Sequence, residues 1–188
     1  AFNKVYDGTN TATLFNLILS GIVGSDNVTV SGTATFATAN VGTGIAVSTN
    51  LTLGGANSSY YTLVQPTGLV ADITPAPQTI TFNALPAKTF GNVPFTLSAT
   101  GGGSTSPVTF TSDNPLVATI SGNTVTIVGA GSANITASQA GDANYDAAVD
   151  VVQPLLVNKA NQTITFAQPA THAIGEAPFT LTATANST

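Results

Sequence analysis

Polar and apolar residues alternate along much of this chain. The alternation is clearest in five short runs, at residues 79–82, 95–98, 108–111, 124–127 and 134–137. A period of two is typical of half-buried β-strands and differs from the period of 3.6 that a helix requires. Similar runs occur earlier, at 28–30, 33–36 and 51–53, and clusters of Gly, Asn, Asp, Ser and Pro separate the runs as turns would. The pattern therefore predicts an all-β chain.

The number of strands refines this prediction. Residues 75–158 hold about seven short strands and no helical segment, a pattern typical of an immunoglobulin-like β-sandwich. The predicted inward-facing residues are Ile80, Phe82, Phe95, Leu97, Val108, Phe110, Val117, Ile120, Val125, Ile127, Ile135, Ala137 and Val151.

An internal repeat divides the chain into domains. Residues 78–104 match residues 162–188 without a gap, and we call the distance from Gln78 to Gln162 the repeat offset. This offset is close to the length of a small β-sandwich, so it indicates whole small domains in tandem. We therefore predict a β domain at 1–74, an immunoglobulin-like domain at 75–158 and the first part of a further such domain at 159–188. Short linkers, one of them rich in proline, predict that the domains form an extended rod.

The composition excludes several classes of partner. Only 6% of the residues are charged, the formal net charge is −5, and the three cations are Lys4, Lys88 and Lys159. Such a chain lacks the basic surface that nucleic acid or an anionic membrane requires. No run of 18 apolar residues predicts a membrane span, and the absence of cysteine rules out disulfides and thiol chemistry.

Few residues are candidates for catalysis or metal binding. His172 is the only histidine, and because the repeat places Lys88 at the equivalent position, we expect His172 to be exposed and without function. Asp142, Asp146 and Asp150 are evenly spaced, one in every four positions, and Asp113 lies in another loop. Carboxylate oxygens are calcium ligands, but this spacing is not that of an EF-hand loop. We expect solvated turn residues here, with calcium as the alternative, and we predict no catalytic, cofactor or metal site.

Other features have both a functional and a structural interpretation. Lys4, close to Tyr6 and Asp7, could form an intramolecular Lys–Asn isopeptide bond, but the structural interpretation is an exposed lysine beside a turn. The 32 threonines could form an ice-binding or sugar-binding face, although threonine also favours strands. N-x-S/T glycosylation sequons begin at Asn27, Asn50, Asn57, Asn134, Asn161 and Asn186.

Several motifs carry a resemblance to known families. Residues 4–9 (KVYDGT), 21–26, 40–44 and 71–73 resemble the YDG (MBG-type) repeat of large bacterial surface proteins. Residues 111–115, 117–120 and 129–137 resemble the bacterial immunoglobulin-like domains of invasin and intimin stalks. The resemblance implies a secreted, extracellular adhesin or surface filament in which these domains are spacers.

The sequence thus favours a non-catalytic stalk segment whose partners are neighbouring repeats of the same chain and other copies in a filament. A glycan-binding or ice-binding module and an accessory domain of a secreted enzyme are the alternatives. A binding module would need a flat platform, for which Tyr60, Tyr61 and Tyr145 are the candidates in a chain without tryptophan. Residues 159–188 supply only about two strands, so we expect either further chain or a neighbouring subunit to complete this domain.

Overall fold

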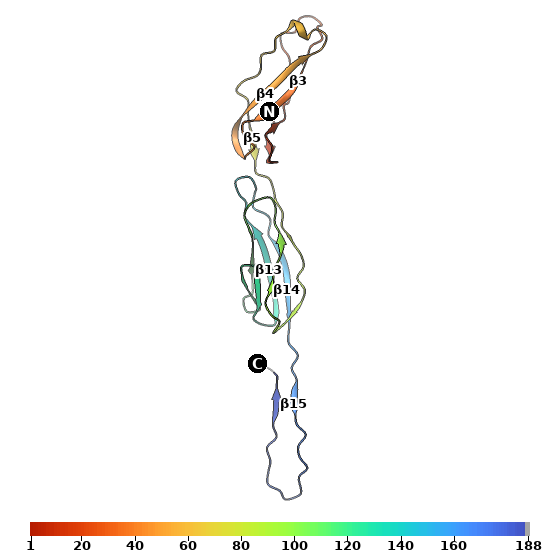
Figure 1. Cartoon of the computed structure of the whole chain (residues 1–188), viewed down its shortest axis with the longest axis vertical. Coiled ribbons are helices and arrows are strands. Elements are labelled where there is room, and N and C mark those ends of the chain that lie inside the picture. The colour runs from red at the N-terminus through yellow and green to blue at the C-terminus, as the bar shows by residue number, and fades with distance from the viewer. Residues whose placement is uncertain (187–188) are drawn as a thin grey trace. The chain divides into compact units, whose positions relative to one another are not determined.

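The computed structural model describes residues 1–186, and these residues form an almost purely β structure (Figure 1). The helical element among them is a short 3-10 turn, η1 (Ser58–Tyr60). This part of the chain contains no helix with the length and apolar character needed to cross a membrane. The all-β class predicted from the alternation is confirmed.

The chain divides into two compact units, each assembled from separate stretches of sequence. Unit 1 contains Ala1–Asn83, Ser98–Phe110 and Thr136–Val152, and unit 2 contains Ala84–Leu97, Thr111–Ile135 and the chain from Gln153 onward.

Unit 1 contains a five-stranded sheet with the strand order β1-β5-β4-β3-β2. The strands are β1 (Lys4–Val5), β2 (Thr11–Ala12), β3 (Thr29–Phe36), β4 (Gly42–Gly54) and β5 (Val70–Thr74). The long strands β3 and β4 form an antiparallel pair along the whole of β3, and Figure 1 shows them side by side. The short first strand, β1, is instead parallel to the last strand, β5.

Gly32 allows most of two predicted runs, 28–30 and 33–36, to lie on one continuous strand that begins at Thr29. Its φ is +151°, and a Cβ at this position would overlap the backbone of Asn50 on β4. Glycine tolerates both the dihedral angle and the close approach. The run at 51–53 is likewise the last part of the long strand β4. These three runs therefore lie, apart from Val28, on strands that are longer than the alternation indicates.

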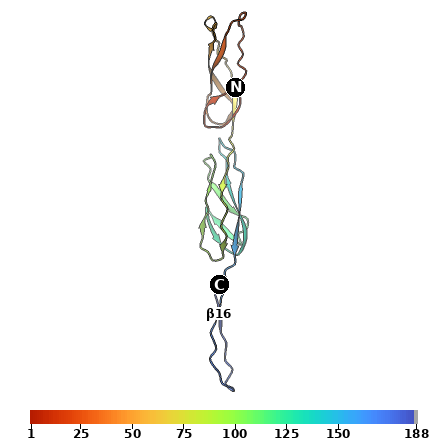
Figure 2. The ribbon, with the colours of Figure 1, turned by 90° about the vertical axis from the view of Figure 1, so that its right-hand side faces the viewer.

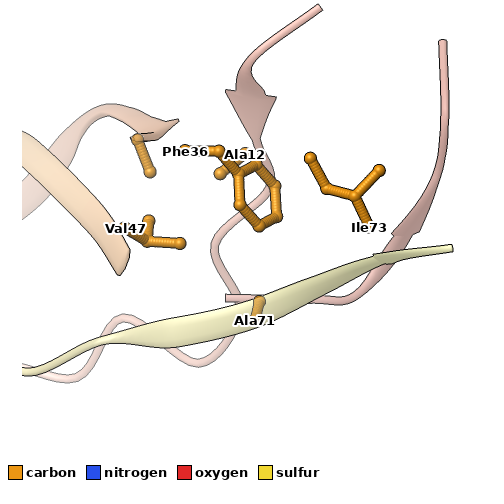
Figure 3. Close-up of a cluster of buried hydrophobic side chains, with 6 residues drawn as sticks. Ala12, Phe36, Val47, Ala71 and Ile73 are labelled. Carbon is orange, nitrogen blue, oxygen red and sulfur yellow. The ribbon is translucent and has the colours of Figure 1, made fainter. Parts of the chain in front are cut away.

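The core of this sheet is centred on Phe36, which is 2% exposed. The other buried members of the cluster are Ala12, Ala34, Val47, Ala71 and Ile73 (Figure 3). These side chains come from β2, β3, β4 and β5. Because burial of a large apolar side chain contributes roughly 1.5–3 kcal/mol, the cluster favours the observed register over a one-residue slip, which would turn the apolar side chains outward.

Unit 1 also contains the first strand pair of the predicted second domain. β6 (Thr81–Phe82) and β9 (Ala99–Thr100) are antiparallel, with Phe82 opposite Ala99. The Phe82 ring is buried, and its centre lies 5.4 Å from that of Phe110.

Two further sheets are formed by strands between residues 88 and 158, with the orders β10-β13-β14-β7 and β11-β12-β8. The strands are β7 (Lys88–Thr89), β8 (Phe95–Thr96), β10 (Val108–Ser112), β11 (Ala118–Ser121), β12 (Thr124–Ile127), β13 (Gly131–Gln139) and β14 (Val151–Asn158). Within unit 2, β12 is antiparallel to β11 and β8, whereas β7 is parallel to β14, the last strand of its sheet.

The core predicted for residues 75–158 is confirmed in part. The predicted residues that are buried are Ile80, Phe82, Leu97, Val117, Val125, Ile135 and Ala137. The predicted residues that are only half-buried are Phe95, Val108, Phe110, Ile120, Ile127 and Val151. The alternation misses Leu155 and Val157 on β14, which are 0% and 2% exposed, because no polar residue in the Leu155-Leu156-Val157 run marks the inward face.

The chain from Asn161 to Asn186 contains a hairpin of β15 (Ile164–Phe166) and β16 (Ala183–Ala185), seen at the blue end of the ribbon in Figures 1 and 2. Phe166 pairs with Ala183, which is the register of Phe82 with Ala99 moved along the chain by the repeat offset. All residues of this segment are exposed. Ser187 and Thr188, the end of the predicted domain 159–188, lie outside the described residues.

Candidate functional site

A dense set of polar contacts in unit 1 surrounds the loop 141–146, which we call the junction loop. The carboxylate of Asp142 fixes the conformation of the junction loop. Oδ1 accepts hydrogen bonds from the backbone N–H groups of Asn144 (2.8 Å) and Tyr145 (3.1 Å), and Oδ2 accepts one from the backbone N–H of Thr105 (3.0 Å). The Thr105 and Asn144 bonds hold the pKa of Asp142 below its usual range. Asp142 therefore acts as an anionic acceptor for its own turn.

The junction loop binds the chain that follows β5. The backbone N–H of Ala76 donates to the carbonyl of Asn144 (2.9 Å), and the N–H of Asp146 donates to the carbonyl of Ala76 (3.0 Å). Ala76 and Tyr145 thus form a parallel β-bridge. Both backbone groups of Ala76 are paired, and its side chain is 8% exposed. This linker residue is held as part of a strand pair.

Gln78 strengthens the same connection from a buried position. Its side chain is one of the two buried polar side chains among the described residues. Nε2 donates to the carbonyls of Asp146 (2.8 Å) and Ala140 (3.2 Å), and Oε1 accepts from the N–H of Ser104 (2.9 Å). Because a buried amide without partners would cost about 1–3 kcal/mol, Gln78 favours the arrangement in which the linker and the loop stay together.

Two side chains of the junction loop also contact the sheet of β1–β5. Asn144 Oδ1 accepts a hydrogen bond from the backbone N–H of Val41 (3.1 Å). The Tyr145 ring packs edge-on against Tyr6, with ring centres 5.4 Å apart and planes at 79°, a favourable aromatic geometry. Tyr145 also lies so close to Gly103 that a Cβ on this glycine would overlap the tyrosine ring. Within unit 1, the junction loop therefore connects the residues after β1, the residues before β4 and the linker after β5.

Lys4 organises the turn that contains the YDG motif. Its Nζ donates to Asp7 Oδ1 (2.7 Å), to the carbonyl and hydroxyl of Thr9 (2.7 and 3.0 Å) and to the carbonyl of Thr11 (3.2 Å). The hydrogen bond from Lys4, assisted by that from the Thr9 N–H, lowers the pKa of Asp7 to about 2. Within residues 1–186, the hydrogen-bond partners of Nζ include no asparagine side chain, so the structure does not bring together the groups of a Lys–Asn isopeptide bond.

A parallel pairing of the first and last strands of one sheet occurs twice, in two segments whose sequences show no obvious similarity. Lys4 is opposite Ile73 in the β1–β5 pair, and Lys88 is opposite Val157 in the β7–β14 pair. Each partner of the second pair lies one repeat offset after its counterpart. The residues that follow the short strands, Tyr6 and Phe90, donate their N–H groups to the carbonyls of Thr74 (2.8 Å) and Asn158 (2.9 Å), which are separated by the same offset.

His172 has a structural contact that sequence reasoning did not anticipate. Its ring stacks on Phe179 with centres 3.9 Å apart, and Nδ1 lies 2.6 Å from Glu176 Oε2. At the equivalent repeat positions, Lys88 Nζ lies 4.5 Å from the centre of the Phe95 ring. The two residue types differ, but each covers the same phenylalanine of its repeat. His172 is exposed, as expected.

The acidic candidates remain dispersed. Asp113 accepts hydrogen bonds from the backbone N–H and the side-chain amide of Asn134 (2.7 and 2.8 Å), and Asp142 is committed to its turn. Asp146 uses its backbone to bind Ala76 and Gln78, and Asp150 is exposed. Over residues 1–186, no three or more His, Asp or Glu side chains gather in a way that could hold a metal ion.

The tyrosines proposed as a binding platform have separate surroundings. Tyr60 is 78% exposed. The hydroxyl of the adjacent Tyr61 donates to Asp26 Oδ2 (2.7 Å) and accepts from the N–H of Val23 (3.0 Å). The bond to Asp26 raises the pKa of Tyr61. Tyr145 packs in the junction loop, so these rings do not form one flat surface.

The outer face of the β3–β4 pair is polar. Its cross-strand neighbours are Ser31 and Thr52, Thr33 and Asn50, and Thr35 and Ser48. Two of the hydroxyls donate to carbonyls of the neighbouring strand, from Ser48 to Thr35 and from Thr52 to Ser31, at 3.4 Å each. Short polar side chains of this kind fit the solvent face of a sheet.

Comparison with known proteins supports one of the two sequence resemblances. No curated protein and no solved structure matches the chain. The family model of the YDG domain matches residues 1–68. That stretch includes Lys4, Asp7 and Thr9 of the motif turn, and it ends before β5 begins. Residues 1–68 are therefore similar to the YDG domain, and the match supports that part of the prediction.

Proposed function

We propose that this chain is a stalk or spacer segment of a secreted, repetitive bacterial cell-surface adhesin or filament. In this function the segment carries tension along the chain and catalyses no reaction. Its folded parts are small β domains, with immunoglobulin-like domains at residues 75–158 and from residue 159, arranged as an extended array. The match to the YDG domain and the internal repeat support this proposal.

The observation that carries the proposal is the parallel pairing of the first and last strands of a sheet, β1 with β5 and β7 with β14. Tension between the chain that enters a sheet at its first strand and the chain that leaves it at its last strand would pull β1 and β5, or β7 and β14, in opposite directions along their length. The hydrogen bonds between two parallel strands are then loaded in shear, and they bear the load at the same time. Resistance to pulling depends on the rate of unfolding, so such a pair at the ends of a domain raises its mechanical strength.

The junction loop supports the same function. A load-bearing array needs linkers that do not add slack, and Ala76 has both of its backbone groups paired to the loop. Gln78 and Asn144 add side-chain bonds around it. These contacts leave very little of the linker free to extend.

Single-molecule force spectroscopy of the chain tests the proposal. Phe90→Pro removes the N–H that binds the Asn158 carbonyl, while Phe90→Ala removes the same side chain and keeps the N–H. We expect the force at which the domain at residues 75–158 unfolds to fall in the proline variant. In the alanine variant, this force should stay close to that of the unmodified chain. Equal unfolding forces in all three chains, or extension without a discrete unfolding step, would contradict a load-bearing function.

A further inference from the structure

The surroundings of Tyr6 in unit 1 and of Phe90 in unit 2 are equivalent up to a point. Both residues follow a short strand that begins with lysine, and both donate an N–H to the last residue of the domain's final strand. The linkers also correspond, because Ala160 and Gln162 lie one repeat offset after Ala76 and Gln78. The two sites differ in what covers them.

In unit 1 the site is covered by the junction loop. Tyr145 packs on Tyr6, Asn144 and Asp146 pair with Ala76, and the carbonyl of Asp146 accepts from Gln78. Each of these partners comes from one short segment with the sequence Gly-Asp-Ala-Asn-Tyr-Asp.

In unit 2 the corresponding groups line a pocket of about 520 Å³. Its walls include Phe90, Gly91, Gly129, Ala160 and Gln162. Phe90 is 40% exposed, and Ala160 and Gln162 are exposed. Within residues 1–186, neither the side chain of Gln162 nor the backbone of Ala160 has the hydrogen bonds that Gln78 and Ala76 make.

We propose that this pocket is the docking site for a second junction loop, with the Asn-Tyr-Asp pattern, carried by the domain that residues 159–186 begin. Its tyrosine packs on Phe90, its backbone pairs with Ala160, and its carbonyls accept from Gln162. The inference rests on the tandem array proposed above and specifies how one repeat attaches to the next.

The junction loop of a second copy of this chain is not the occupant. That loop already binds Ala76, Val41 and Tyr6 within its own unit. Occupying the pocket in another molecule would require breaking these contacts. A loop supplied by the following domain has no such cost, and the linker holds it close to the pocket.

The experiment uses the chain extended after Thr188 with a copy of residues 105–158, which supplies the strands that follow the equivalent hairpin in the second domain. Phe90→Trp provides a single fluorescent reporter, because the chain contains no tryptophan. Val93→Trp, at a position that is 80% exposed, is the matched control. Chymotrypsin cleavage after Phe166, which is 51% exposed in the hairpin, reports separately whether the added strands complete the third domain.

We expect the extension to protect Phe166 from cleavage. We also expect it to reduce acrylamide quenching of the Phe90→Trp reporter at least twofold, with no change for the Val93→Trp reporter. Replacing the tyrosine in the added copy of Tyr145 by alanine should restore quenching while Phe166 stays protected.

Two results would overturn the inference. If Phe166 is protected but the Phe90→Trp reporter stays as exposed as in the shorter chain, the third domain folds without docking, and the array proposal survives alone. If Phe166 is still cleaved, the tandem array itself is contradicted and the docking site falls with it.

Discussion

Replacement of Asn144 by alanine isolates one contact of the junction loop. The substitution removes the side-chain acceptor of the half-buried Val41 N–H, while the two backbone bonds of Asn144, to Asp142 and Ala76, remain available. The loop should therefore keep its conformation and lose one connection to the sheet of β1–β5.

The expected cost follows from the burial of that bond. A part-buried hydrogen bond contributes about 0.5–1.5 kcal/mol, and an N–H left without a partner moves the cost toward the upper end. With a urea dependence of about 1–3 kcal/mol per molar for small domains, a loss of about 1 kcal/mol lowers the midpoint of the affected transition by roughly 0.3–1 M.

Urea unfolding followed by circular dichroism measures this midpoint, and amide hydrogen exchange at Val41 locates the effect. Asn83→Ala is the control, because Asn83 is exposed and makes no side-chain hydrogen bond within residues 1–186. If Asn144→Ala and Asn83→Ala shift the midpoint equally, or if exchange at Val41 is unchanged in Asn144→Ala, the junction loop does not stabilise the sheet as described.

Two further predictions concern the core and the motif turn. Leu155→Ala should destabilise its domain by about 2–5 kcal/mol through loss of burial and formation of a cavity, whereas Leu156→Ala, at a position that is 49% exposed, should cost less than about 1 kcal/mol; equal urea midpoints for the two variants would contradict the assigned inward face of β14. For Asp7, the pKa of about 2 in the folded chain lies below the unfolded value of about 3.9, so its stabilisation is fully present above pH 4 and is lost as the pH falls toward 2. Thermal melts should therefore show Asp7→Asn less stable than the unmodified chain at pH 6 and nearly equal to it at pH 2, and a difference that does not depend on pH would refute this account.

Some of the structure could be predicted from local pattern. The period-two runs predicted strands, and the YDG motif predicted the family whose model matches residues 1–68. The repeat predicted about two strands in residues 159–188, and in the structure Phe166 pairs with Ala183 as Phe82 does with Ala99. These features depend on neighbouring residues or on direct sequence similarity.

The candidate site could not be predicted in the same way. The role of Asn144 depends on Val41, which is distant in the sequence, and no local pattern marks that contact. The equivalence of Lys4 and Lys88 is likewise hidden, because their neighbours differ and only the pairing with β5 and β14 reveals it. Similarly, the contact of His172 with Phe179 depends on the hairpin bringing the two rings together.

The most direct test of the central proposal, a passive spacer built from domains in extended array, is small-angle X-ray scattering of the chain in solution. A compact globule of this length has a radius of gyration of about 16 Å. The proposal predicts a clearly larger radius and a pair-distance distribution with the long tail of an elongated particle. A radius close to that of the compact globule, with a symmetric distribution, would contradict it.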